Sequence, residues 1–144
     1  MSRVINVDGP GKQRNHLMRT AAEVLRLISQ KSGLDNEARD MVAMLIFCLR
    51  GIHAGIDEST LAWEKRDYWV KAEQFRARWA WTDRADQELT AIVSSDSWDE
   101  LPMALANLFP HFTDIRIAKV TRNPDLWRGA YQRLLREPSE RTKV

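Results

Sequence analysis

The amino-acid sequence predicts an all-α fold: a compact bundle of about five helices in a single domain of 144 residues. Glycine and proline are scarce, with 6 and 5 residues, and they gather in a few places. The stretches between them are rich in Ala, Leu, Arg, Glu and Lys, which favour helix. Apolar residues within those stretches recur at steps of three and four, the spacing of one helix face.

The first helix is predicted over residues 10–31, after the turn signal in residues 8–11, and Gly33 marks its end. Residues 1–9 are expected to form an N-terminal arm. The apolar face of this helix comprises Leu17, Ala21, Val24, Leu25 and Ile28.

A second helix is predicted to begin after Asp35, a suitable N-cap, with Glu37 near the positive end of the helix dipole. From Met41 to Leu49 nearly every residue is apolar, so we expect this helix to be the most buried element. Cys48, the only cysteine, lies in that run. It is predicted to be a buried core residue, and its being alone excludes an intrachain disulfide and a cysteine-based zinc site.

A long aromatic-rich helix or helix pair is predicted over roughly residues 36–94, because no glycine or proline occurs between Gly55 and Pro102. The candidate breaks are Asp57–Thr60, where Ser59 is a possible cap, and Arg66–Asp67. The sequence leaves open whether one helix or two span this region.

Two apolar stripes run along residues 61–93 when these are placed on a helix at about 100° per residue. The first stripe has core spacing and comprises Leu61, Tyr68, Ala72, Phe75 and Trp79. The second lies roughly opposite and comprises Trp63, Val70, Ala77 and Trp81. Either the helix is sandwiched between helices of its own chain, or one stripe meets a second chain. Trp69 lies on neither stripe and is expected to be a rim contact or an exposed anchor.

The last third of the chain is predicted to contain three shorter helices. Ser97 and Glu100 have the spacing of a capping box, before a short helix that ends near Leu108. A further helix is expected over residues 111–120, with a strand paired to residues 4–7 as the alternative.

The final helix is predicted to start at the signal Asn123-Pro124-Asp125, with Asn123 as its cap. Residues 138–144 are expected to be a mobile polar tail.

Charge is unevenly distributed although the net charge is only +2. Residues 1–33 carry a net charge of +4, residues 34–111 carry −6, and residues 112–144 carry +4. The basic ends are interpreted either as complementing the acidic middle within one fold, or as a basic surface for nucleic acid or an acidic partner.

Targeting features predict a cytoplasmic protein without a membrane partner. The N-terminus lacks the apolar segment of a signal peptide, and no stretch approaches the ~18 apolar residues of a membrane span.

No catalytic, cofactor or metal signature is found, so the sequence favours a non-enzymatic role without a cofactor. No histidine follows a glutamate by three residues, the motif of di-metal bundles. His53 and Asp57 are spaced to share a ligand, but two ligands do not make a metal site. An enzyme or ligand binder would need a cavity lined by His53, Asp57 and an aromatic residue. Residues 9–12 lack the full phosphate-loop pattern, and Pro10 removes a backbone donor.

The segment Ala62–Arg76, which reads AWEKRDYWVKAEQFR, together with Pro10-Gly11-Lys12, resembles short helical bacterial proteins of unassigned function. The resemblance implies a helical fold and carries over no activity, partner or site residue.

Two functions are predicted. The first is protein–protein interaction or self-association, as a homodimer or as an adaptor that binds another protein, with a candidate interface of Trp63, Trp69, Val70 and Trp81. The alternative is a small regulatory nucleic-acid-binding protein, which requires the two basic ends of the chain to meet on one surface. The candidate basic surface comprises Lys12, Arg14, Arg19, Arg116, Lys119 and Arg122.

Overall fold

The computed structural model describes residues 9–137, and in that part of the chain it contains five α-helices and no strand, which confirms the predicted all-α class. The α-helices are α1 (Gly9–Ser29), α2 (Asn36–Glu64), α3 (Trp69–Ser95), α4 (Leu101–Ala106) and α5 (Ala130–Arg136). Three 3₁₀ turns join them, η2 (Trp98–Glu100), η3 (Phe109–Phe112) and η4 (Pro124–Leu126). The predicted N-terminal arm, apart from Gly9, and the predicted polar tail lie outside the described residues.

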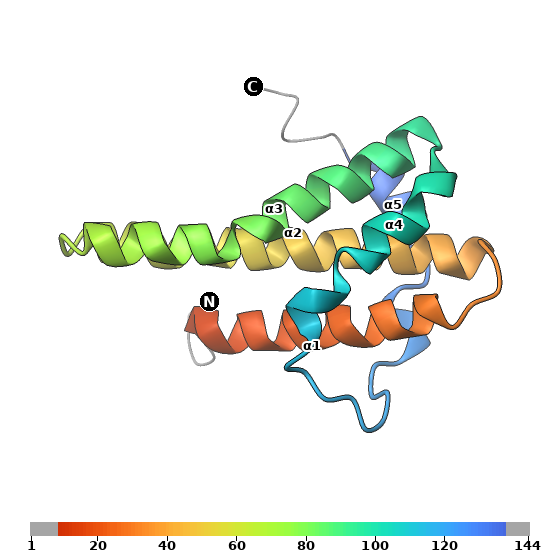
Figure 1. Cartoon of the computed structure of the whole chain (residues 1–144), viewed down its shortest axis with the longest axis horizontal. Coiled ribbons are helices and arrows are strands. Elements are labelled where there is room, and N and C mark those ends of the chain that lie inside the picture. The colour runs from red at the N-terminus through yellow and green to blue at the C-terminus, as the bar shows by residue number, and fades with distance from the viewer. Residues whose placement is uncertain (1–8, 138–144) are drawn as a thin grey trace.

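Helix α2 is the centre of the molecule. Helix α1 packs along one side of it, α3 returns antiparallel along another, and α5 lies against it (Figure 1). The connected ends of α2 and α3 extend past the N-terminal end of α1 as a two-helix projection (Figure 1). We call residues 61–71, at the free end of this projection, the hairpin tip.

The break between α2 and α3 falls at residues 65–68, so the candidate break at Arg66–Asp67 is confirmed and two helices span residues 36–95. Asp67 has a φ of 66°, a left-handed conformation that ends the helical path. The amide of Tyr68 donates to the carbonyl of Trp63, at 2.9 Å, which closes the turn. The other candidate break, Asp57–Thr60, lies within α2.

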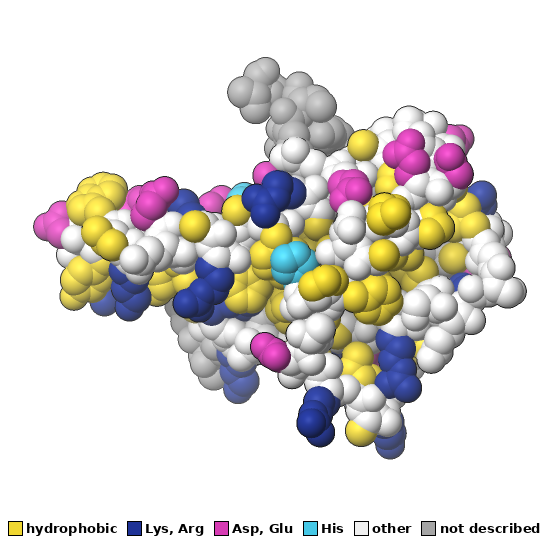
Figure 2. Space-filling model, viewed as in Figure 1, with side chains coloured by type: hydrophobic (Ala, Val, Ile, Leu, Met, Phe, Trp, Pro, Cys, Tyr) yellow, Lys and Arg dark blue, Asp and Glu magenta, His cyan; other side chains and the backbone are white. Residues whose placement is uncertain are grey.

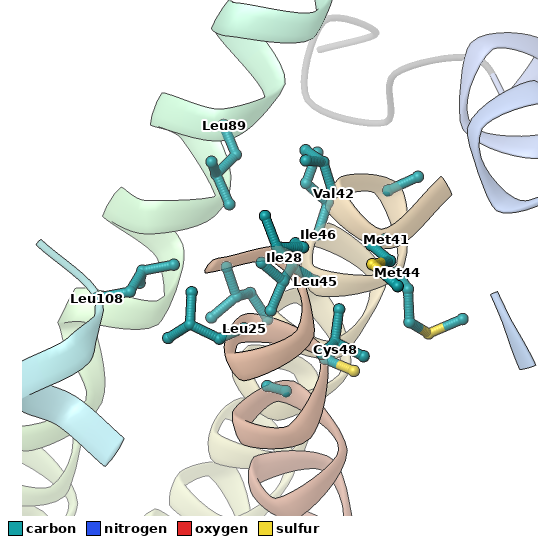
Figure 3. Close-up of a cluster of buried hydrophobic side chains, with 14 of the residues drawn as sticks. Leu25, Ile28, Met41, Val42, Met44, Leu45, Ile46, Cys48, Leu89 and Leu108 are labelled. Atoms are coloured by element: carbon teal, nitrogen blue, oxygen red, sulfur yellow. The ribbon is translucent and has the colours of Figure 1, made fainter. Parts of the chain in front are cut away.

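The core is built around α2, whose residues Met41–Ile46 are all buried, as predicted for the most apolar run (Figure 3). Leu25 and Ile28 from α1 and Leu89 from α3 pack into the same cluster. Cys48 is buried as predicted, and burial raises the pKa of its thiol to about 12. This thiol is therefore protonated and unreactive at neutral pH.

Of the three predicted helix starts, the one at Asp35 is confirmed, and those at Asn123 and Ser97 are wrong. Asp35 caps α2, because its carboxylate accepts a hydrogen bond from the amide of Ala38 at 2.8 Å. Asn123 accepts from the amide of Asp125, but it opens the 3₁₀ turn η4, and α5 begins only after Gly129. The capping box is absent, since Ser97 makes no cap hydrogen bond and its hydroxyl pairs with that of Ser95.

The helix predicted over residues 111–120 is wrong. The chain makes only the 3₁₀ turn η3 there, and residues 115–120 have neither helical nor strand structure. Arginines of α1 bind the carbonyls of this segment instead: Arg26 donates to Ile117 at 2.6 Å, and Arg19 donates to Lys119 at 3.0 Å. These long-range bonds replace the local bonds that a helix would make.

No helix formed by the described residues has both the length and the apolar character needed to cross a membrane.

Candidate functional site

The hairpin tip presents large apolar side chains to solvent. Trp69 and Val70, two residues of the predicted interface, are 59% and 71% exposed, and Leu61 and Tyr68 beside them are 56% and 51% exposed. Figure 2 shows hydrophobic side chains gathered at this projecting end. Exposed aromatic and aliphatic side chains grouped at one place are typical of a contact surface, whereas scattered ones need no explanation.

Charges of both signs surround this apolar surface. Each of the six charged residues that flank it is exposed. Three are basic and three are acidic: Lys65, Arg66, Lys71, Glu58, Asp67 and Glu73. At the base of the tip, Arg76 binds Glu64 at 2.6 Å, and this hydrogen bond lowers the pKa of the Glu64 carboxyl. The tip therefore has no dominant charge.

Leu61 and Tyr68 were expected to face the core, and both are exposed instead. The predicted stripe assumed one continuous helix. The turn at residues 65–68 changes the helical phase, so a stripe drawn through it does not stay on one face. Ala72 in the same stripe is fully buried because it lies after the turn, at the contact between the helices.

The other two residues of the predicted interface, Trp63 and Trp81, are half-buried and engaged within the chain. Trp63 packs edge-on against Phe75, with ring centroids 4.9 Å apart, and Lys71 lies over the Trp63 ring at 4.5 Å. Trp81 stacks on His111 at 3.9 Å with an interplanar angle of 5°. These tryptophans stabilise the packing of α3 and contribute little free surface.

Arg14 packs against aromatic side chains of α3 and is not part of an open basic surface. Its guanidinium lies 5.0 Å from the Phe75 ring and 5.4 Å from the Trp79 ring. Burial, and then the neighbouring charge of Arg78, lower the pKa of Arg14. Among the described residues, neither Nη1 of Arg14 nor Nε1 of Trp79 has a hydrogen-bond acceptor, although both are buried.

The two basic ends of the chain meet along α1. Arg19 donates to the carbonyl of Arg116 at 3.2 Å and to that of Lys119 at 3.0 Å. Arg122 donates to the hydroxyl of Thr20 at 3.0 Å. Four of the six residues of the predicted basic surface thus lie together, while Arg14 is held by α3 and Lys12 lies in the first turns of α1. We define the basic face as Arg19, Arg26, Arg116, Lys119 and Arg122.

Glu23 joins the two parts of the basic face from beneath. It is fully buried and accepts hydrogen bonds from Nε of Arg19 at 2.6 Å and from the amides of Thr121 and Arg122 at 2.7 and 2.9 Å. Burial alone would raise its pKa. The bonds from Arg122, Arg19 and Thr121 outweigh burial and lower the pKa to about 2. Glu23 is therefore ionised at neutral pH and fastens residues 121–122 to α1.

Sequence reasoning missed Glu23 and Asp40, two of the carboxylates that hold the C-terminal part of the chain. Asp40 accepts from the amides of Gly129 at 3.1 Å and Tyr131 at 2.9 Å, which docks the start of α5 on α2. A signal was present for Glu23, because it lies inside the apolar run Ala21–Leu25. An acid in such a position is buried only when it has partners.

The features considered for catalysis do not come together. His53 and Asp57 form a pair at 3.7 Å on the surface of α2. A groove of about 590 Å³ lies elsewhere, and neither residue lines it. Its wall is mainly apolar and includes Ile28, Leu34, Trp98, Leu101, Leu105 and Phe109. Within residues 9–137, no three His, Cys, Asp or Glu side chains are grouped so as to hold a metal ion.

Comparison with protein-family models, curated protein sequences and solved structures finds no match to this chain. The resemblance to short helical bacterial proteins therefore stays a prediction, and the functional argument depends on the geometry alone.

Proposed function

We propose that this protein is a helical interaction module that self-associates through the hairpin tip. The observation that carries the proposal is the exposure of Tyr68, Trp69 and Val70, with Leu61 beside them, at the free end of the α2–α3 projection. Tryptophan and tyrosine dominate the binding energy of many protein interfaces because they bury a large area with few rotatable bonds.

The charge pattern around these side chains favours a protein partner over a polyanion. The basic residues Lys65, Arg66 and Lys71 are matched in number by exposed acids, so the tip has no field of one sign to attract nucleic acid or an anionic membrane. A surface with an apolar centre and a rim of both signs has the composition of a protein interface.

A second copy of the chain fits this pattern best. A two-fold interface places one patch against itself, so the patch must be self-complementary. Exposed bases such as Lys65 and Arg66 in one copy would lie against exposed acids such as Glu58 and Asp67 in the other, around a shared centre formed by Trp69 and Val70. The projecting position of the tip leaves room for this approach (Figure 1).

The molar mass in solution tests the proposal. We expect light scattering to give a dimer for the wild type across a range of salt, and a monomer for the double variant Trp69→Ala/Val70→Ala. A suitable control is Leu135→Ala, because Leu135 is also large, apolar and 52% exposed but lies on α5. This control variant should remain dimeric.

A wild-type protein that stays monomeric at high protein concentration contradicts self-association. A double variant that is folded and still dimeric contradicts the tip as the interface. Thermal unfolding of each variant distinguishes loss of association from loss of fold.

A further inference from the structure

We infer that the basic face binds the phosphodiester backbone of nucleic acid. The inference does not rest on the hairpin tip, because the face is built from α1 and residues 116–122. In Figure 2, Lys and Arg side chains gather along the lower edge of the molecule, over the segment between η3 and η4.

The exposed charges of the face itself are all positive, and the exposed acids Asp114 and Asp125 flank its loop in the sequence. Glu23 is the only acid in α1, and residues 115–123 contain none. Since Glu23 is fully buried beneath the arginines, its carboxylate fixes the face without being presented to a ligand. Five cations against this one carboxylate leave a local net charge of +4, in contrast to the balanced charges of the hairpin tip.

The face is also preorganised. Arg19 and Arg26 each bind carbonyl groups of residues 116–119, so the loop backbone is tied to α1. The side chains of Arg116 and Lys119 are exposed on the outside of the tied loop. A ligand that contacts them meets positions that are already ordered, which reduces the entropic cost of binding.

The chemistry of the face favours phosphate over an apolar partner. Arg116 is exposed, and its planar guanidinium group matches the geometry of phosphate oxygens. Arg19, Arg26 and Arg122 add positive charge, while their guanidinium groups bind groups of the chain itself. None of the large exposed apolar side chains of the described residues belongs to the face. It therefore lacks both the aromatic anchor of a protein hot spot and the apolar side chains that enter a lipid surface.

The inference is tested by fluorescence anisotropy with short, mixed-sequence single-stranded DNA, duplex DNA and single-stranded RNA, each titrated at several salt concentrations. The test variant is Arg116→Ala/Lys119→Ala. The matched control is Arg84→Ala/Arg136→Ala, which removes the same charge from two exposed positions outside both the basic face and the hairpin tip. Thermal unfolding confirms that both variants fold.

We expect at least one nucleic acid to bind at low salt and its affinity to fall steeply with salt. In the test variant the slope of log affinity against log salt should be shallower by about 2, and binding at low salt about ten-fold weaker, because two phosphate contacts are lost. The control should keep the wild-type slope. The strands that bind show whether DNA or RNA, single or duplex, is the ligand.

The inference is overturned by no binding at low salt, by equal binding of the test variant and the wild type, or by equally tight binding of poly-glutamate, which would indicate an acidic polypeptide. Vesicles containing anionic lipid are a further competing ligand. If the protein binds them more tightly than nucleic acid, the inference is also overturned. The variant Trp69→Ala/Val70→Ala should bind nucleic acid with the wild-type salt slope, so the failure of one proposal is distinguishable from the failure of the other.

Discussion

The hairpin tip and the C-terminal segment, residues 113–137, are stabilised in opposite ways. The tip consists of the connected ends of two long helices, whose backbone hydrogen bonds are local. Its side chains contact neighbours in the same hairpin, as Trp63 contacts Phe75. The C-terminal segment has only η4 and the short helix α5 as regular structure. It is held by side chains of α1 and α2 that are about 90 to 100 residues away in sequence, Glu23, Glu37 and Asp40.

The comparison shows that a region with regular secondary structure need not be buried, and that an irregular region can be. The tip is fully helical apart from its turn, yet it presents Trp69 and Val70 to solvent. The C-terminal segment is mostly irregular, yet Trp127 is 2% exposed and its indole donates to Glu37 at 3.2 Å. Local backbone bonds suffice for a projecting surface, whereas an irregular segment needs buried anchors and long-range polar partners.

The largest expected effect contrasts a tryptophan from each region. Trp127→Ala should lower the free energy of unfolding by about 3–5 kcal/mol, because it leaves a large cavity in the core. At a protein concentration low enough for the monomer, Trp69→Ala should change it by no more than about 0.5 kcal/mol, because the side chain is then largely solvated. Urea unfolding followed by circular dichroism measures both. Similar losses for the two variants would contradict the contrast.

The next effect concerns the carboxylate beneath the basic face. Its folded pKa of about 2 lies below the ordinary value of 4.5, so the stability contributed by ionised Glu23 is fully present above about pH 5 and is lost as the pH falls towards 2. We expect Glu23→Gln to destabilise the protein by about 3 kcal/mol at neutral pH.

The pH dependence of that difference is the decisive measurement. The free energies of unfolding of the wild type and Glu23→Gln should converge between pH 5 and pH 2, because protonation then removes the same charge from the wild type. A difference that stays constant over this range would mean that the loss arises from packing rather than from charge.

The smallest effect is in the turn of the hairpin tip. Asp67→Gly should raise the free energy of unfolding by about 0.5 kcal/mol, since glycine adopts a positive φ without the strain of a Cβ, less some chain entropy. Asp67→Val should lower it, because a β-branched residue tolerates that conformation poorly. Thermal unfolding of the pair gives the sign of each change. Equal values for both would show that the turn is not rigidly held.

Helix periodicity predicted α1, the burial of α2 and the Asp35 cap, since each depends on residues close together in the sequence. The aromatic stripes were less successful. The stripes assume one continuous helix, but the chain turns at Asp67, one of the two candidate breaks, and this turn shifts the helical phase. The helix predicted over residues 111–120 was wrong for another reason. Its sequence is compatible with a helix, but Arg19 and Arg26 of α1 bind the carbonyl groups of this segment and hold it as a loop.

The candidate sites were predicted in parts. Trp69 was expected to be a rim contact or an exposed anchor because it fits neither stripe, and it is exposed. The residues of the basic face other than Arg26 were named, without the carboxylate that joins them. Pairing between Glu23 and residues 121–122 is a long-range contact, and no local spacing encodes it. A single sequence indicates that a buried acid needs a partner, but it does not identify which of many donors supplies it.

Because the residues of the basic face are far apart in the sequence, the hairpin tip and the basic face can form only at different stages of chain synthesis. Helices α1, α2 and α3 and the hairpin tip are complete once residue 95 has been made, and so is every residue with which these three helices contact one another. The basic face requires residues 116–122 to fold back on α1, across 97 to 100 positions. A nascent chain would therefore form the proposed self-association surface before the proposed phosphate-binding surface, because the cations of the basic face come together only when the chain is nearly complete.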